Sequence, residues 1–353
     1  MPSSGTKMLD HLLELDLGEA PVALEWSRCG RWLAALNVDG EAVLIDTASA
    51  NRINRWTAHG AGALALAWHP KQAILATSCQ NGCLKLWQVD GDQGVRALSA
   101  IELDPCMGSL WVERLRWRPD GKQLAFAIGN TVMLASAAGE IEATFIFRGG
   151  TVADLDWRPG GALLGIAGYG GIAIQNGLDP LADPMLLNWK GSLLSLSWSP
   201  DGAYIVAGCQ DNTVHLWRFR SQQDAQMSGF AYKPLQLSWV DRGKRLLTSG
   251  INDLVMWPFD RKGPEGREPE TRSFHEKSIP TLAVAANGKT IATGCRSGWI
   301  AVWKSSREIT PTVSTMIESR VEYLRWSSKK NGKRLAAVGR QGILRLFDLD
   351  EAW

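Results

Sequence analysis

The sequence predicts an all-β protein made of repeated four-stranded antiparallel sheets, the blade unit of a β-propeller. Two observations support this: a unit recurs every 40 to 49 residues along the chain, and each unit holds short apolar runs separated by tight turns. No repeat contains a convincing amphipathic helix. We therefore expect a single propeller domain over residues 1–353.

The clearest repeat is Leu193–Trp217. It contains an apolar run, an SPDG turn, a second run, an AGCQD turn and a third run that ends in Trp217. This order predicts three antiparallel strands joined by two hairpin turns. A fourth, more polar run fits between one repeat and the next, as in residues 52–57, 143–147 and 184–189.

The first run of every repeat ends at one equivalent position, here called the origin. The origins are Trp26, Trp68, Trp117, Trp157, Trp198, Trp239, Val284 and Trp326. A leucine stands two residues before each of them: Leu24, Leu66, Leu115, Leu155, Leu196, Leu237, Leu282 and Leu324. The third run closes 18 to 21 residues after the origin, at Ile45, Trp87, Ala135, Gln175, Trp217, Trp257, Trp303 and Phe347. The origin and closing tryptophans are expected to fill space between neighbouring blades.

Eight origins predict eight blades, with seven as the second choice if the Val284 copy lies outside the ring. Too few residues follow Phe347 to complete the last blade, and an unpaired edge strand is a liability. The alternating segment Leu9–Leu17, within residues 8–17, is expected to supply the missing strand and join the two ends of the chain. Residues 259–271, rich in Gly, Pro and charge, are expected to form a surface loop.

Composition argues against several classes of protein. The 38 basic and 36 acidic residues give a net charge of +2, which argues against a protein spread along nucleic acid. No apolar run reaches 18 residues, and the N-terminal segment lacks a signal-peptide pattern. The six cysteines are too sparse for a disulfide framework, so we expect a cytoplasmic location.

The repeats resemble those of the WD40 family of β-propellers. The motifs that carry the resemblance are WSPDG at Trp198–Gly202, WRPDG at Trp117–Gly121, and the KLW and HLW closings at Trp87 and Trp217. The Trp-Asp pair of that family is nearly lost, because an Asp follows the closing residue only at Asp46 and Asp348. The resemblance implies a hydrogen-bond network that is incomplete in most blades, and one face that docks peptides or protein domains.

The connections that enter the first strands, together with the turns between second and third strands, are expected to share that face. Their aromatic and basic residues suit partner binding, with acidic partners favoured. The candidate docking residues are His59, Trp111, Tyr169, Trp189, Lys190, Tyr232, Lys233, Lys277, Arg296, Arg320 and Arg340.

A second set of charged residues lies on the first strands, opposite the leucines. Its members are Glu25, Arg114, Arg116, Asp154, Asp156 and Arg325, with Tyr323 beside the last. Opposite charges on neighbouring copies predict ion pairs between blades along a central channel. The alternative is a channel site for a small charged ligand or an enzymatic centre.

No catalytic or metal-binding motif emerges. Cys79, Cys209 and Cys295 share one repeat phase and are expected to be small core residues. Cys79 and Cys83 flank one turn, which leaves a redox or thiol–metal pair as a minor alternative. The sequence thus predicts a non-catalytic interaction scaffold without cofactor, monomeric on its own, that binds a protein or peptide and does not bind a membrane.

Overall fold

The structure, a computed structural model, describes residues 7–48, 52–91, 93–104, 110–249, 251–260, 263–329 and 333–349. The described residues form strands and turns, with a short 3-10 helix, η2 (Asp241–Gly243). The chain divides into two compact units. The middle unit is residues 25–198, and the N/C unit combines residues 1–24 with residues 199–353. The expectation of one domain over the whole chain stays a prediction.

Short strands follow one another through the middle unit, with β3 beginning just before it. They are β3 (Pro21–Trp26), β4 (Trp32–Asn37), β5 (Glu41–Asp46), β6 (Arg52–Thr57), β7 (Ala63–Trp68), β8 (Ile74–Cys79), β9 (Cys83–Asp90), β10 (Gly94–Glu102), β11 (Val112–Trp117), β12 (Gln123–Ile128), β13 (Thr131–Ser136), β14 (Ile141–Ile146), β15 (Asp154–Trp157), β16 (Leu163–Asn176) and β17 (Met185–Trp198).

The N/C unit has the same pattern. Its strands are β1 (Lys7–Met8), β2 (His11–Asp16), β18 (Tyr204–Cys209), β19 (Val214–Arg218), β20 (Asp224–Met227), β21 (Leu237–Val240), β22 (Arg245–Ser249), β23 (Asp253–Pro258), β24 (Glu270–Ser273), β25 (Thr281–Val284), β26 (Ile291–Gly294), β27 (Trp299–Trp303), β28 (Val313–Met316), β29 (Val321–Trp326), β30 (Arg334–Gly339) and β31 (Ile343–Asp348).

These strands form a β-propeller of four-stranded antiparallel blades, as predicted, but in seven sheets and not eight. The difference arises at copies four and five. Strand β17 continues without a break from the fourth run of one copy into the first run of the next, so both copies belong to one six-stranded sheet, in the order β15-β16-β17-β18-β19-β20. The Val284 copy, which the seven-blade alternative placed outside the ring, forms the ordinary sheet β25–β28.

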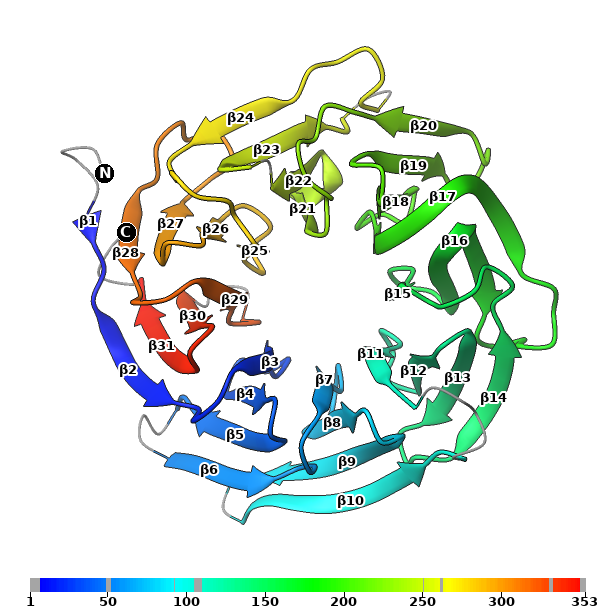
Figure 1. Ribbon diagram of the computed structural model, residues 1–353, viewed down its shortest axis with the longest axis horizontal. Helices are drawn as coiled ribbons and strands as arrows, with labels where there is room; N and C mark the ends of the chain where they lie inside the picture. Colours follow the sequence, from blue (N-terminus) through cyan, green and yellow to red (C-terminus); the bar gives the residue numbers. More distant parts are fainter. Residues whose placement is uncertain are drawn as a thin grey trace. The chain divides into compact units, whose positions relative to one another are not determined.

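The N-terminal segment completes the last sheet, as predicted. Strand β2 pairs antiparallel with β31, with Leu13 opposite Leu346 and Leu15 opposite Leu344 (Figure 1). The Arg345 guanidinium donates to the Glu14 carboxylate at 2.6 Å across this pair. The preceding strand β1 adds a parallel fifth strand to β28, which the sequence did not predict (Figure 1).

The Pro-Asp-Gly turn after Trp117, one of two with this sequence, shows how the first hairpin of a repeat is held. Gly121 has φ +80°, a conformation that favours glycine, and a Cβ there would lie 2.4 Å from the His69 ring. Asp120 accepts hydrogen bonds from the backbone N–H of Lys122 and from the Arg118 guanidinium. The turn is therefore fixed both by its glycine and by its aspartate.

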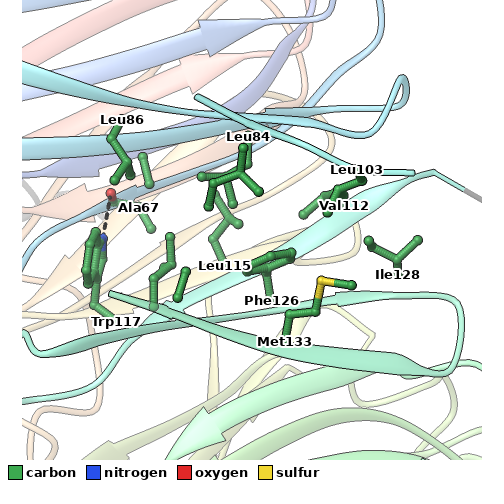
Figure 2. Close-up of a cluster of buried hydrophobic side chains, with 14 of the residues drawn as sticks. Ala67, Leu84, Leu86, Leu103, Val112, Leu115, Trp117, Phe126, Ile128 and Met133 are labelled. Atoms are coloured by element: carbon green, nitrogen blue, oxygen red, sulfur yellow. Dashed lines mark hydrogen bonds between the residues drawn. The ribbon is translucent and has the colours of Figure 1, made fainter. Parts of the chain in front are cut away.

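The origin tryptophans link one sheet to the next, which explains their number. The indole N–H of Trp117 donates to the Ala67 carbonyl at 3.3 Å, over a cluster of buried apolar side chains (Figure 2). The indole of Trp157 donates to the Arg116 carbonyl in the same way, at 2.9 Å. Each acceptor directly precedes an origin residue of the previous copy. These buried tryptophans combine apolar burial with a hydrogen bond between sheets, as the sequence predicted for space between blades.

The expected surface loop at 259–271 is partly core. Phe259 is buried and its ring packs edge-on against Trp239 and Tyr204. Residues 261 and 262 lie outside the described residues, and β24 begins at Glu270. The loop between is held by the Glu265 carboxylate, which pairs with Arg218 at 2.6 Å.

Candidate docking surface

His59, an expected docking residue, is buried. Its Nε2 shares a 2.8 Å hydrogen bond with the Thr77 hydroxyl, which also accepts the indole N–H of Trp87 at 2.8 Å. Burial, followed by the nearby Lys85 ammonium, lowers the His59 pKa to about 4, so the ring is neutral near pH 7. His59 therefore belongs to the core and not to a docking surface.

Three other copies place a ring nine residues before the origin, as His59 does. They carry Trp189, Phe230 and His275. His275 is buried, shares a 2.7 Å hydrogen bond with the Thr293 hydroxyl, and has a pKa lowered to about 4 by burial. Trp189 is half-buried, and its indole lies against the backbone of Gly191. Sequence reasoning missed this period, which would have moved His59 from the docking set to the core, while Trp189 stays a predicted docking residue.

Four expected docking residues of the N/C unit line a single groove, of about 450 Å³, here called the Tyr232 groove. They are Tyr232, Lys233, Arg296 and Arg320. The whole lining is Asn212, Tyr232, Lys233, Leu235, Gln236, Ser249, Ser278, Ile279, Pro280, Arg296 and Arg320. The groove therefore combines cationic side chains with an exposed aromatic ring.

A tight turn presents the aromatic end of this groove. The Leu235 N–H donates to the Lys233 carbonyl at 3.0 Å, and Pro234 between them restricts the backbone. Tyr232 and Leu235 are 59% and 54% exposed. This end of the groove therefore holds two large side chains out in solvent.

The other side of the groove is basic. Lys233 and Arg296 are exposed, and the half-buried Arg320 lies 3.1 Å from the Glu322 carboxylate. Two further expected docking residues, Arg340 and Lys277, lie next to the groove through backbone hydrogen bonds. The Arg340 N–H donates to the Arg320 carbonyl at 2.9 Å, and the Arg296 N–H donates to the carbonyl of Ser278, which follows the exposed Lys277, at 3.0 Å.

The apolar floor of the Tyr232 groove was not foreseen. Ile279 is 4% exposed and lies beside Pro280, with Leu235 at the edge. Ile279 is held by its backbone N–H, which donates to the Ile251 carbonyl at 3.0 Å. The sequence signal available was the apolar pair Ile279-Pro280 directly before β25, but other copies also carry apolar pairs there, so the pair did not single out this groove.

The remaining expected docking residues belong to the middle unit. Trp111 is 53% exposed just before β11, and Lys190 is exposed on β17. Tyr169 is 65% exposed and lines a second groove, of about 730 Å³, between β14 and the β16–β17 pair.

This second groove coincides with a missing tryptophan. Between copies one and two, Trp56 and Trp87 pack edge-to-face at 5.7 Å. The equivalent positions between copies three and four are Phe145 and Gln175, both of which line the groove. The Gln175 amide instead donates to two carbonyls of the adjoining loop, at 3.1 and 3.0 Å.

The charged residues predicted on the first strands form links between sheets within the middle unit. The Asp154 carboxylate lies 3.3 Å from Arg116 and 3.5 Å from Arg114, and also accepts the Leu196 N–H at 3.0 Å. Glu25 accepts the backbone N–H of Trp68 at 2.9 Å. In the N/C unit, the Arg325 guanidinium lies 5.7 Å from the ring centre of Tyr323 and donates to the carbonyl of Leu324.

Asp156 is the most perturbed of these acids. It keeps an exposed edge, yet protein atoms surround it closely, and desolvation raises its pKa to about 7. Its carboxylate accepts the Trp198 N–H at 2.9 Å, while the Trp198 indole donates to the Asp156 carbonyl at 3.2 Å. These bonds give Asp156 a structural role between β15 and β17.

The cysteine pair has the chemistry of buried thiols. Cys79 and Cys83 are both free, and the Cys83 thiol lies 3.1 Å from the Glu102 carboxylate. Burial and this hydrogen bond raise the Cys83 pKa to about 12, which opposes formation of the reactive thiolate. Cys209 and Cys295 are buried as expected, while Cys106 lies outside the described residues.

Two features of the described residues bear on other classes of function. In that part of the chain, His, Cys, Asp and Glu side chains form no group of three or more that could hold a metal ion. The same residues include no helix with the length and apolar character needed to cross a membrane.

Comparisons with known proteins agree with the repeat pattern. The family model "WD domain, G-beta repeat" matches residues 50–88, 186–218 and 267–304. The "Ribosome biogenesis protein WDR12 homolog" of Drosophila yakuba is 23% identical over 145 residues, 40% of this chain and 32% of that protein. The protein of the same name from Drosophila erecta is 23% identical over 111 residues, 30% of this chain and 26% of that protein. The chain thus spans about a third or less of the curated relatives it matches.

A solved structure matches the fold over almost the whole chain. The crystal structure of the computationally designed Ika8 protein has a TM-score of 0.77 at 16% sequence identity, and the match covers 96% of this chain and 99% of that one. At this identity the likeness concerns the fold alone. With family matches in three of its repeats and blades of four antiparallel strands, the chain is consistent with a WD40-repeat propeller.

Proposed function

We propose that the chain is a non-catalytic scaffold that docks a protein or peptide partner in the Tyr232 groove. The observation that carries this proposal is the convergence of an exposed tyrosine, two exposed basic side chains and an apolar floor on one groove. Aromatic and arginine side chains around an apolar centre are typical of the residues that dominate binding energy at interfaces.

The partner segment is proposed to be acidic. Lys233 and Arg296 are exposed, the described lining of the groove includes no acidic residue, and the Glu322 carboxylate lies beside Arg320. A cationic groove speeds association with an acidic segment and disfavours basic ones. Trp111, Tyr169 and Lys190 of the middle unit remain predicted contacts of the same kind.

A catalytic or small-ligand role for the first-strand charges is not favoured. Asp154, Asp156 and Glu25 already accept backbone N–H groups of the neighbouring strand. The named function of the Drosophila relatives is not carried over, because the match spans a minority of each chain. Only the repeat architecture is carried over. A monomeric state and a cytoplasmic location stay predictions.

The proposal is tested by charge reversal. A Lys233→Glu/Arg296→Glu variant is compared with a Lys71→Glu/Lys122→Glu variant, which makes the same charge change at exposed positions outside the groove. Partners are captured by a photo-crosslinking residue at Tyr232, and synthetic acidic peptides from them are titrated by fluorescence anisotropy.

We expect the groove variant to lose at least about tenfold in peptide affinity and the control to keep it. Replacing the acids of the peptide by amides should weaken binding to the wild-type chain in the same way. Equal binding by both variants would reject the Tyr232 groove as the docking site.

A further inference from the structure

One groove of the middle unit lies where a contact of other copies is missing. Between copies one and two, the Trp56 and Trp87 rings pack edge-to-face with centres 5.7 Å apart. Phe145 and Gln175 take the equivalent positions between copies three and four. Both line the groove of about 730 Å³ that also contains Tyr169, here called the Tyr169 groove. This groove therefore occupies a place where a tryptophan side chain would otherwise fit.

The floor of the Tyr169 groove is apolar and packed. Phe147, Ile166 and Ala173 line it and belong to one buried cluster. The Tyr169 N–H donates to the Gly149 carbonyl at 3.1 Å, and a Cβ at Gly149 would collide with the Tyr169 carbonyl oxygen. This close approach of two backbone segments holds the Tyr169 end of the groove in place. The groove is thus formed without a ligand.

The rim of the groove carries large apolar side chains from three strands. They are Ile146 on β14, Tyr169 on β16 and Leu186 on β17, and each is more than half exposed. Together with the buried floor they form one apolar surface that water can reach. An apolar segment laid in the groove would remove this surface from water, which favours binding.

The two ends of the groove carry opposite charges. The outer part of the β16–β17 pairing runs from Gly171 at one end to Ile174 at the other. Arg148 lies at the Gly171 end, next to the backbone contact of Tyr169, and Asp183 lies at the Ile174 end, just before β17 begins. Both charged residues line the groove and are exposed. The distance from Gly171 to Ile174 corresponds to about 10 Å of extended chain, so the charges suit the two ends of a short extended segment.

We propose that the Tyr169 groove binds an extended peptide segment of a partner protein. The segment has a central aromatic side chain, an acidic residue towards Arg148 and a basic residue towards Asp183. The aromatic ring occupies the space that Phe145 and Gln175 leave open, and the end charges fix the direction of the segment. This site is separate from the Tyr232 groove and does not depend on it.

The test is a titration of the full chain into fluorescein-labelled peptides, followed by fluorescence anisotropy. All of the charged peptides share the centre Ile-Trp-Val. Their end residues are Glu and Lys, Lys and Glu, Glu at both ends, or Lys at both ends. A further peptide replaces the central Trp by Ala. The single residue analogue N-acetyltryptophanamide serves as a competitor.

Variants of the chain separate the groove from the rest of the surface. Arg148→Glu/Asp183→Lys exchanges the charges at the two ends of the groove. Its matched control, Lys122→Glu/Asp39→Lys, makes the same exchange at exposed positions of the middle unit outside the groove. Gln175→Trp restores the tryptophan of other copies and fills the groove. Circular dichroism of each variant checks that the fold is retained.

We expect one of the two peptides with opposite end charges to bind with a dissociation constant on the order of 100 μM or tighter. It should bind about three- to tenfold more tightly than either uniformly charged peptide. Replacing the central Trp by Ala should weaken binding at least about tenfold.

Arg148→Glu/Asp183→Lys should prefer the peptide with the reversed end charges, a gain that misfolding cannot produce. The matched control should keep the wild-type preference, and Gln175→Trp should bind none of the peptides. The Lys233→Glu/Arg296→Glu variant of the Tyr232 groove should bind the preferred peptide as the wild type does.

Four results would each overturn the proposal. They are no saturation of any peptide at about 0.5 mM chain, an unchanged peptide preference in Arg148→Glu/Asp183→Lys, and wild-type affinity in Gln175→Trp. The fourth is competition by N-acetyltryptophanamide as strong as that by the unlabelled peptide, which would identify a site for a small aromatic ligand.

Discussion

Replacing Thr77 by valine should destabilise the protein more than the same change at the equivalent threonine of other repeats. Valine keeps the shape and the β-branched side chain but removes the hydroxyl that bonds to both His59 and Trp87. All three side chains are buried. Two polar groups then lose their partner, each at a cost of about 1–3 kcal/mol, so we expect a loss of about 2–6 kcal/mol in the free energy of unfolding.

The chain supplies its own graded controls. Thr293 bonds to His275 but not to the indole of Trp303, whose N–H has no partner among the described residues. Thr293→Val should therefore cost about 1–2 kcal/mol. Thr248 occupies the same register, is fully buried, and its hydroxyl has no hydrogen-bond partner in the described part of the chain. Thr248→Val should be neutral or stabilising.

Urea unfolding followed by tryptophan fluorescence measures the series. The expected order of destabilisation is Thr77, then Thr293, then Thr248. If the three valine variants were equally destabilised, the hydrogen bonds would not carry the effect, and the reasoning from the His–Thr–Trp contacts would be refuted.

Three further predictions concern the termini and pH. Leu17→Ala, at a side chain 1% exposed, should cost about 2–4 kcal/mol, whereas Leu12→Ala at 59% exposure should cost little; both are read from urea midpoints. His59 has a folded pKa of about 4, below its unfolded value near 6.5. Its contribution to folding stability is therefore complete above pH 6.5 and is lost as the pH falls towards 4. His59→Phe should flatten the stability profile between these two pH values. The pH dependence of Asp156 runs in the opposite direction, because its folded pKa of about 7 exceeds the unfolded value of 3.8. Its contribution to folding stability is therefore lost as the pH rises from 3.8 to 7. Asp156→Asn should be more stable than the wild type at pH 8 and equal to it near pH 4. A variant profile parallel to the wild type in either titration would contradict the assigned group.

Much of the fold could be predicted because the repeat signal is strict. The leucine two residues before each origin, present in all eight copies, and the Pro-Asp-Gly turns of two copies place the first strand, the turn and the second strand in one phase. The partner of the last strand also followed from sequence, because the alternation of Leu13 and Leu15 matched an edge that needed covering.

The number of sheets could not be predicted, since it depends on one backbone connection. Copies four and five have ordinary repeat spacing, and nothing in residues 190–192 indicates that β17 runs through them as a single strand. Strand β1 is also too short, at two residues, to give any periodic signal.

The candidate docking residues were only partly predictable. A histidine or aromatic residue in a loop between strands can be exposed to solvent or can cover the core, and the residue type alone does not determine which. Tyr232 is exposed on a tight turn, whereas His59 is buried and shares a hydrogen bond with Thr77, nine residues after the origin. Only comparison of the copies at one repeat position separates the two cases.

The pairing of β2 with β31 has a consequence for how the polypeptide is made. Glu14 and Arg345, which bond across this pair, are 331 positions apart. During synthesis β2 therefore leaves the ribosome long before β31 is made, and its edge stays unpaired until then. A product that stops before β31 leaves β2 without its partner strand, and quality-control proteases can recognise the unpaired edge.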